Sequence, residues 1–146
     1  MVSPCFIAGL LFITDFQFSV LDLANSINPV IGQSNVQGSN QIWMFNPIDD
    51  DGELFKIQSA LGGSFLTFTP SDEAPLFRQA TTDSEGSVFS LFCNPADAAS
   101  GSVIHNATGL ALTAWHQEDG STITPVTYET YTGRTEQTFF FVTIGT

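Results

Sequence analysis

The residues of this chain that could do chemistry are two histidines, two cysteines and 15 acidic residues. The spacing of His105 and His116 suits neither a metal pair on a helix nor a tight hairpin clamp, so we expect each to be an ordinary core or surface histidine. Cys5 and Cys93 have no CxxC or Cys/His company, and we interpret them as buried free thiols rather than zinc ligands or a disulfide framework. Neither pair predicts a catalytic or metal centre.

The acidic residues form no recognisable catalytic or calcium motif. The run 49–53 (DDDGE) lacks the alternating ligands and distal Glu of a calcium loop, and we interpret it as a solvated turn. The sequence gives no way to pair two carboxylates for glycoside hydrolysis, and it has no G-x-S-x-G elbow or phosphate-cradling loop. We therefore expect a protein that is not an enzyme and that uses no cofactor and no metal.

The charge of the chain limits its partners. Three Lys or Arg stand against the 15 acids, for a formal net charge of −12, so the surface repels phosphate backbones and anionic lipid. The apolar run from Cys5 to Ile13 is too short to cross a bilayer, and it has neither a preceding basic residue nor a cleavage site. We expect no nucleic-acid partner, no membrane insertion and a cytoplasmic location, with non-classical release left open. The sequon at Asn106 should then stay unmodified.

The elements that must position any site are short strands. Runs rich in Phe, Val, Ile and Thr recur between clusters of Gly, Pro, Asn, Asp and Ser, and no window has sustained helical periodicity. This pattern predicts an all-β fold with strands at 10–13, 19–23, 42–45, 54–58, 65–68, 88–92, 102–105, 110–114, 124–128 and 138–142.

A threefold repeat selects among all-β architectures. The triplets 21–23, 66–68 and 112–114 occupy comparable places, and each is followed by a loop and then by a large aromatic, at Trp43, Phe89 and Phe139. Repeats of this length cannot bury a core alone, so they pool their apolar faces, with the aromatics as packing. We predict one β-trefoil domain over 1–146, with three units of about four strands at roughly 1–48, 49–96 and 97–146. A β-sandwich is the main competitor.

One fragment of the first unit carries a family resemblance. The sequence GSNQIW at 38–43 resembles the Q-x-W signature of ricin B-like (R-type) lectins, with QTF at 137–139 and SVF at 87–89 as weaker versions. Together with SVLDL at 19–23 and VIG at 30–32, the first unit is similar to the mushroom branch of that family. The resemblance implies a β-trefoil with up to one shallow sugar pocket in each unit.

The resemblance also implies roles for individual residues. Asp22 is expected to accept two sugar hydroxyls, Asn40 to bind a neighbouring hydroxyl, and Gly38 to let the ring approach the backbone. Gln37 and Val36 stand where mushroom relatives commonly place a ring, and we count Gln37 among the ligand-binding residues. The missing ring could come from another segment, for example Phe55.

Other positions are expected to differ in role between the units. Gln41 and Gln137 are assigned to support of the fold. Thr67 and Thr113 replace the carboxylate in the second and third units, and Gly86 and Glu136 stand at the places of Asn40, so these pockets are weaker secondary-site candidates.

These expectations combine into a non-catalytic lectin and agglutinin with a defence role. Its partners are predicted to be galactosides and N-acetylgalactosamine-containing glycans, lactose and T-antigen-like glycans among them. With one strong site per chain, useful avidity requires a homodimer. The alternative is a β-trefoil protease inhibitor that uses 115–125 as its reactive loop, and a storage protein is the third hypothesis.

Overall fold

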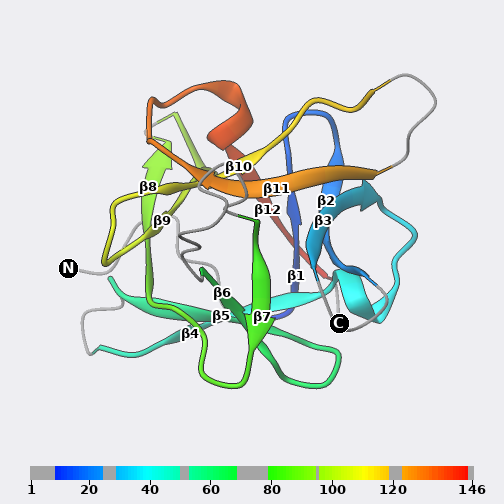
Figure 1. The fold of residues 1–146 in the computed structure, drawn as a ribbon, viewed down its shortest axis with the longest axis horizontal. Coiled ribbons are helices and arrows are strands. Elements are labelled where there is room, and N and C mark those ends of the chain that lie inside the picture. The colour runs from blue at the N-terminus through cyan, green and yellow to red at the C-terminus, as the bar shows by residue number, and fades with distance from the viewer. Residues whose placement is uncertain are drawn as a thin grey trace, which may run out of the picture.

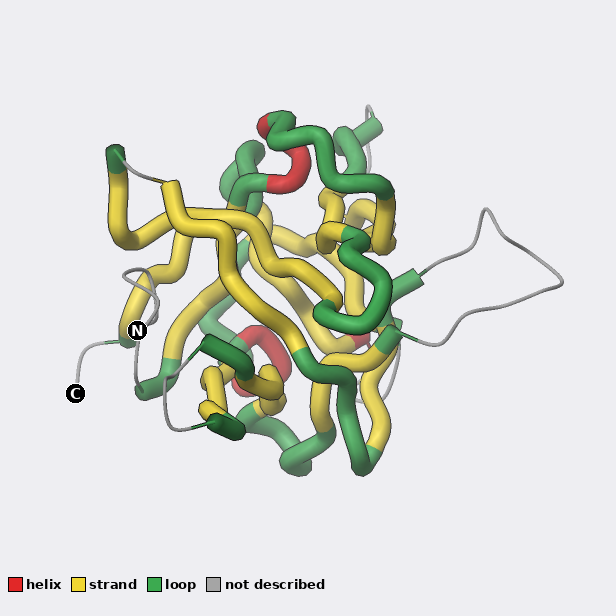
Figure 2. Tube along the Cα trace, turned by 90° about the vertical axis from the view of Figure 1, so that its left-hand side faces the viewer, coloured by secondary structure: helices red, strands yellow, loops and turns green. Residues whose placement is uncertain are grey.

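The structure is a computed structural model that describes residues 9–24, 29–49, 53–68, 79–94, 96–118 and 123–144, with the backbone alone at 97 and 98. Strands make up most of this part of the chain, and the helical pieces are short turns (Figure 2). Two of these turns are η2 (Ser39–Gln41) and η3 (Thr135–Gln137). The strands are β1 (Leu11–Thr14), β2 (Ser19–Leu23), β3 (Val30–Ser34), β4 (Trp43–Pro47), β5 (Phe55–Ser59), β6 (Phe65–Thr67), β7 (Thr81–Asp83), β8 (Phe89–Asn94), β9 (Asp97–His105), β10 (Ala111–Ala114), β11 (Ile123–Glu129) and β12 (Phe139–Thr143).

Six strands close into a barrel. β1 pairs with β4, β4 with β5, β5 with β8, β8 with β9, β9 with β12, and β12 returns to β1, all antiparallel. The three hairpins β2–β3, β6–β7 and β10–β11 lie outside this ring. In Figure 1, β10 and β11 run across the top of the molecule and β2 and β3 descend on the right. A closed six-stranded barrel with three hairpins is a β-trefoil, as the repeat predicts.

The hairpins also bond to one another. β11 pairs with β3 through three residue pairs from Ile123↔Gln33 to Pro125↔Ile31. Ala80 joins the second hairpin to both of the others, since its N–H donates to Val126 O at 2.8 Å and its carbonyl accepts from Val30 N at 2.9 Å. Each unit therefore depends on its neighbours for backbone hydrogen bonds as well as for apolar contacts.

The three repeated aromatics form a layer of the core. Trp43, Phe89 and Phe139 are completely buried, which confirms that they serve packing rather than ligand stacking. Their cross-strand partners in the barrel are Leu11, Phe55 and Gly101. Gly101 has no alternative, because a Cβ there would lie 2.6 Å from the carbonyl oxygen of Phe92. Phe55 is also completely buried, so the suggestion that it supplies a ring beside the sugar is wrong.

The ten strands expected from sequence are all present, with ends shifted by a few residues. Two further strands, β3 and β7, were not predicted. Both are rich in polar residues or glycine and lack the apolar alternation that marks a strand, and both are held by the hairpin partner that precedes them. These two strands therefore form because of tertiary pairing and not because of the strand preference of their own residues.

Cys93 differs from the sequence expectation. It is half-buried and disulfide-bonded, so its interpretation as a buried free thiol is wrong; Cys5 lies outside the described residues.

Two remaining expectations concern membranes and metals. None of the helical segments within the described ranges has the length and apolar character needed to cross a membrane. Across the same ranges, no three His, Cys, Asp or Glu side chains come together in a way that could hold a metal ion.

Candidate functional site

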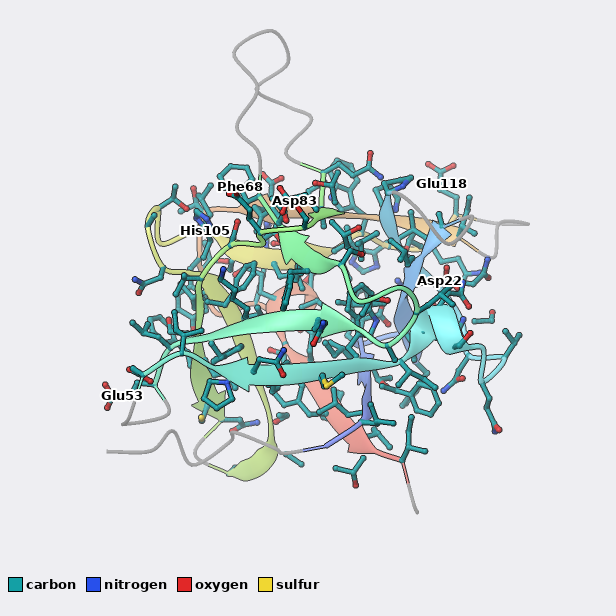
Figure 3. The ribbon with its side chains drawn as sticks, turned by 90° about the horizontal axis from the view of Figure 1, so that it is seen from below. Asp22, Glu53, Phe68, Asp83, His105 and Glu118 are labelled. Atoms are coloured by element: carbon teal, nitrogen blue, oxygen red, sulfur yellow. The ribbon has the colours of Figure 1, made fainter. Side chains whose placement is uncertain are left out.

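Asp22 lies on β2 at the base of the predicted sugar site. All five residues of this strand are buried, and Asp22 has only 6% of its surface exposed. An ionised carboxylate at this depth requires polar partners. The structure provides two amides, which come from turn η2, and Figure 3 shows Asp22 beside that turn.

Each of the two amides donates a hydrogen bond to a different oxygen of the carboxylate. Asn40 Nδ2 donates to Asp22 Oδ1 and Gln41 Nε2 donates to Asp22 Oδ2, both at 2.9 Å. The prediction that Asp22 and Asn40 meet is therefore confirmed, although they are 18 residues apart in the chain. A carboxylate has about four lone-pair directions, so each oxygen of Asp22 keeps capacity for a further donor. Asn40 Oδ1 accepts no hydrogen bond from the described residues and adds an acceptor beside them.

Gln41 is the support of this arrangement. It is completely buried, and its Nε2 also donates to Ser34 O at 2.9 Å, while its Oε1 accepts from Val36 N at 3.0 Å and Gly38 N at 3.4 Å. One side chain thus fastens the loop after β3 to the carboxylate on β2. The assignment of Gln41 to the fold is confirmed.

Gly38 and Gln37 shape the loop above the carboxylate. The backbone of Gly38 is extended, at φ −75°, so its conformation does not demand glycine. A Cβ there would lie 2.6 Å from Asn40 Oδ1, so glycine is needed to leave room for the amide. Gln37 is exposed and has a left-handed φ of 58°, with its N–H donating to Asn35 Oδ1 at 2.8 Å. Gly38 therefore acts through Asn40, and Gln37 turns the chain.

The third unit repeats the support without the carboxylate. Gln137 is completely buried, and its Oε1 accepts from Thr132 N at 2.9 Å while its Nε2 donates to Thr130 O at 2.8 Å and to Thr113 Oγ1 at 3.2 Å. This confirms the structural assignment of Gln137. The Thr113 hydroxyl donates within its own strand, to Ala111 O at 2.9 Å, and so presents no free proton to a ligand.

The second unit uses a different set of contacts. Thr67 Oγ1 donates to Phe65 O at 2.9 Å, and Ser87, in the place of the glutamine, accepts from Phe68 N at 3.0 Å. Gly86 has a φ of 75°, and its N–H donates to Asp83 at 2.6 Å. This bond is the largest of the influences that hold the pKa of Asp83 below its ordinary value. A carboxylate held by side-chain amides is absent from the described part of this unit.

One histidine lies in the core and the other on the surface, as expected for residues without a catalytic or metal role. His105 is buried, with its ring 5.0 Å from that of Phe68, and the two residues are neighbours in Figure 3. Burial lowers the pKa of His105. His116 is exposed on the surface, as expected, but it is not isolated: its Nε2 lies 2.9 Å from Glu136 Oε2. That hydrogen bond is the main reason why the pKa of Glu136 lies below its ordinary value.

A hollow lies beside this pair, and sequence reasoning names Thr113 and Glu136 among its lining residues but misses Trp115 and His116. It has a volume of about 510 Å³ and is lined by residues of the third unit, among them Thr113, Trp115, His116 and Glu136. The available signal was an aromatic and a histidine directly after the third triplet. Both belong to the segment 115–125, which is the reactive loop of the protease-inhibitor alternative and of which 119–122 lie outside the described residues.

Comparisons with known proteins identify the fold. No family model and no curated protein sequence matches the chain. Among solved structures, it is similar to the Macrolepiota procera ricin B-like lectin in complex with lactose, at 23% identity and a TM-score of 0.77, over 94% of this chain and 96% of that one. The Rhizoctonia solani agglutinin matches at 14% identity and a TM-score of 0.77, over 95% and 97% of the two chains. The designed threefold-symmetric protein ThreeFoil matches at 20% identity and a TM-score of 0.73, over 92% of this chain and 99% of that one.

These similarities define the class of fold. The chain is a β-trefoil, the fold that it shares with this lectin and this agglutinin, and the closed barrel agrees with that class. The sandwich alternative is thereby excluded. The comparisons do not favour the protease-inhibitor alternative, because the natural structures named above are described as a lectin and an agglutinin.

Proposed function

We propose that this protein is a non-catalytic lectin that binds galactose- or N-acetylgalactosamine-bearing glycans at the first unit. Asp22 and Asn40 are the polar contacts, Gly38 keeps the approach open and Gln37 lines it. The observation that carries the proposal is the buried carboxylate of Asp22, held by the amides of Asn40 and Gln41 at 2.9 Å.

The chemistry of this pair suits a sugar. Vicinal hydroxyls have two protons at nearly fixed separation, and a carboxylate accepts both through charge-assisted hydrogen bonds that are stronger than neutral ones. Because both oxygens of Asp22 are already fixed by amides, little side-chain entropy remains to be lost on binding. The free Oδ1 of Asn40 can accept a third hydroxyl proton.

The choice of sugar comes from similarity. The Macrolepiota procera lectin is described in complex with lactose, a galactoside, and the GSNQIW fragment of this chain resembles the signature of its family. Galactose and lactose are therefore the first ligands to test, followed by N-acetylgalactosamine and T-antigen-like glycans. A glycan array would define the preferred linkage.

The decisive experiment is calorimetric titration of Asp22→Ala with lactose. We expect loss of measurable binding, because the mutation removes the carboxylate that accepts from the sugar hydroxyls, while circular dichroism should show an unchanged fold. Glu85→Ala is the matched control, since it removes the same charge from an exposed position in the second unit. Equal affinities of Asp22→Ala and wild type would remove Asp22 from the site and refute the proposed mechanism.

Agglutination requires more than one site on each particle. With the first unit as the strong site, we propose a homodimer that presents two copies of it to glycans on a cell surface. Sedimentation velocity at micromolar concentration tests this. A monomer that still agglutinates cells would contradict the dimer and direct attention to a second site on the same chain.

A further inference from the structure

The outer side of the barrel carries apolar side chains where β1 pairs with β12. Phe12 lies opposite Val142 in this pair, and Phe140 lies opposite Thr14. The residues that alternate with them along both strands are buried in the core. Phe140 and Val142 therefore point to the outside, where 37% and 49% of their surfaces are exposed. Two neighbouring strands thus present an apolar surface to solvent.

This surface continues toward β4. Leu11 pairs with Trp43, so the continued antiparallel register brings Leu10 beside Met44. Ile144 N donates to the carbonyl of Leu10 at 3.0 Å, which extends the pairing of β1 with β12 to this residue. Leu10 is exposed over 45% of its surface. We call the patch the barrel face, and it consists of Leu10, Phe12, Met44, Phe140 and Val142.

A second pair of exposed aromatics flanks the barrel face across β9. Phe140 pairs with Ser100 of this strand, and Phe92 of β8 pairs with Ser102. Paired residues share one side of a sheet, so Phe92 and Phe140 lie on the same outer side of the barrel. The ring of Phe92 meets that of Tyr131 edge-on, with centroids 5.2 Å apart. The apolar surface therefore extends around the barrel from β4 to β8.

The charge of the chain restricts what can cover this surface. The net charge is −12, yet the ranges 10–14, 43–47, 89–94 and 139–143 contain no Asp, Glu, Lys or Arg. A partner that binds through opposite charge finds no group to pair with on these strands. Two copies of the chain repel each other over most of their surfaces, and they avoid like-charge contacts along these strands. The pattern of charge thus favours a second copy as the occupant.

The size of the surface fits a dimer contact. Five large apolar side chains have between 37% and 50% of their surfaces exposed, those of Leu10, Phe92, Tyr131, Phe140 and Val142. At about 200 Å² for a large side chain, they offer about 400 Å² of apolar area. A stable dimer buries about 800 Å² on each partner, of which about 65% is apolar. The exposed side chains therefore supply most of the apolar area that such a contact needs.

The closed barrel determines how two copies can meet. Its six strands have no free edge to which a partner strand could bond, so contact must be made face to face through side chains. A two-fold axis places the same patch on both partners. Asp22 and Asn40 belong to a hairpin and a turn outside the barrel strands, and Figure 3 shows Asp22 at the right, with the blue β1 and the red β12 below it. Contact through the barrel face leaves this pair open to solvent.

We propose that the barrel face is the surface on which a second copy of this chain docks, with Phe92 and Tyr131 at its margin. The inference deepens the proposed function, because it names the surface that joins two copies of the first-unit site. The surface itself does not depend on sugar binding. The dimer can therefore be tested in the absence of any sugar.

Sedimentation velocity of the full chain without sugar tests the docking surface. The wild type should sediment as a dimer. Phe140→Glu and Val142→Glu should each weaken the dimer at least tenfold, because every dimer would then bury two carboxylates without partners. Ile123→Glu is the matched control, since Ile123 is exposed to the same extent as Val142 but lies on β11, outside the barrel face. It should leave the dissociation constant unchanged.

A milder variant guards against a failure to fold. Val142→Thr keeps the shape and the β-branch of the side chain but replaces a methyl group with a hydroxyl, and it should weaken the dimer at least twofold. Circular dichroism and the thermal midpoint show whether each variant is folded. An unchanged dissociation constant in Val142→Thr and in both glutamate variants would overturn the proposal.

The dependence on salt is a second test. Salt screens the repulsion between two acidic chains and does not weaken apolar contact. Raising sodium chloride from about 50 mM to about 500 mM should therefore tighten the wild-type dimer severalfold. A dimer that becomes weaker as salt is added would be held by charged groups, and this result would overturn the assignment to the barrel face.

Failure of the docking surface can be distinguished from failure of the proposed function. A monomeric wild type that binds lactose would overturn the docking surface alone. A dimer that Phe140→Glu and Val142→Glu dissociate, but that binds no lactose, would support the surface and refute the proposed function. Equal weakening by Ile123→Glu would overturn the surface. A monomer with a thermal midpoint lowered by Val142→Glu but not by Ile123→Glu would show that the chain covers this face itself, which also overturns the proposal.

Discussion

The first and third units place different side chains on nearly the same support. Gln41 and Gln137 are both completely buried, both accept from backbone N–H groups of the preceding loop, and both donate to a strand of their own hairpin. In the first unit the recipient is the carboxylate of Asp22, and in the third it is the hydroxyl of Thr113. The glutamine belongs to the fold, and the residue that it meets decides the chemistry of the pocket.

The difference extends to the loops beyond the hairpins. The first unit concentrates its polar groups at a buried carboxylate and offers no exposed ring there among the described residues. The third unit has lost the carboxylate but surrounds a hollow with Trp115, Glu129 and Arg134. A repeat can therefore keep its buried glutamine while the residues around it differ from unit to unit.

Removal of the two glutamines should give the largest and most unequal effects. Gln41→Ala leaves a buried carboxylate oxygen without its donor, and we expect a loss of about 3 kcal/mol in the free energy of unfolding. Gln137→Ala leaves only neutral groups unpaired and should cost about 2 kcal/mol. Denaturant unfolding with urea measures both. Equal losses would mean that Asp22 does not depend on Gln41.

Exchange of the residues that the glutamines meet sharpens the comparison. Asp22→Thr gives the first pocket the residue of the third, and we expect at least a tenfold loss of lactose affinity by calorimetry because a hydroxyl lacks charge assistance. The reciprocal variant Thr113→Asp places a carboxylate beside Gln137 Nε2 and should create a sugar response at the third hairpin. Unchanged affinity in Asp22→Thr would show that charge is not what the first pocket uses.

Gly38→Ala tests how the loop acts on the amide. The added Cβ would lie 2.6 Å from Asn40 Oδ1, so the amide must rotate away from Asp22. We expect a severalfold loss of sugar affinity with little change in stability, because the backbone of Gly38 is one that alanine adopts readily. Ser39→Ala, at the exposed neighbouring residue, is the control. A Gly38→Ala variant that binds normally would exclude a role for the position of Asn40.

The smallest change in stability is expected at Asp15, a buried acid that lies outside both pockets. Burial raises the pKa of Asp15 above its ordinary value, and this outweighs hydrogen bonds from Gln17 and Ser19. Since the folded state favours the protonated acid, its stabilising contribution is full below the unfolded pKa and is lost as pH rises through the folded pKa. Asp15→Asn should therefore become progressively more favourable relative to wild type as pH rises from 3 to 7. Thermal unfolding across this range measures it, and parallel pH profiles would contradict it.

Much of the fold could be predicted from residues alone. The strands with apolar alternation, the repeat and the buried aromatics were all predicted, because burial of a shared core imposes a periodic pattern on the sequence. β3 and β7 could not be predicted, since their residues have little strand preference and their order comes from pairing. The bonded state of Cys93 escaped for the same reason, because it depends on which parts of the chain meet.

The sequence by itself determined the trefoil, the support role of Gln41 and Gln137, and the pairing of Asp22 with Asn40. These features follow from local patterns that recur in each unit or match a known signature. Only the tertiary structure revealed the hollow of the third unit, because its wall is assembled from β11, η3 and the 115–118 loop, and Gln17 of the first unit holds that loop. The chain marks this hollow only by the aromatic and the histidine after the third triplet, since most of its residues become neighbours only when the hairpins pack together.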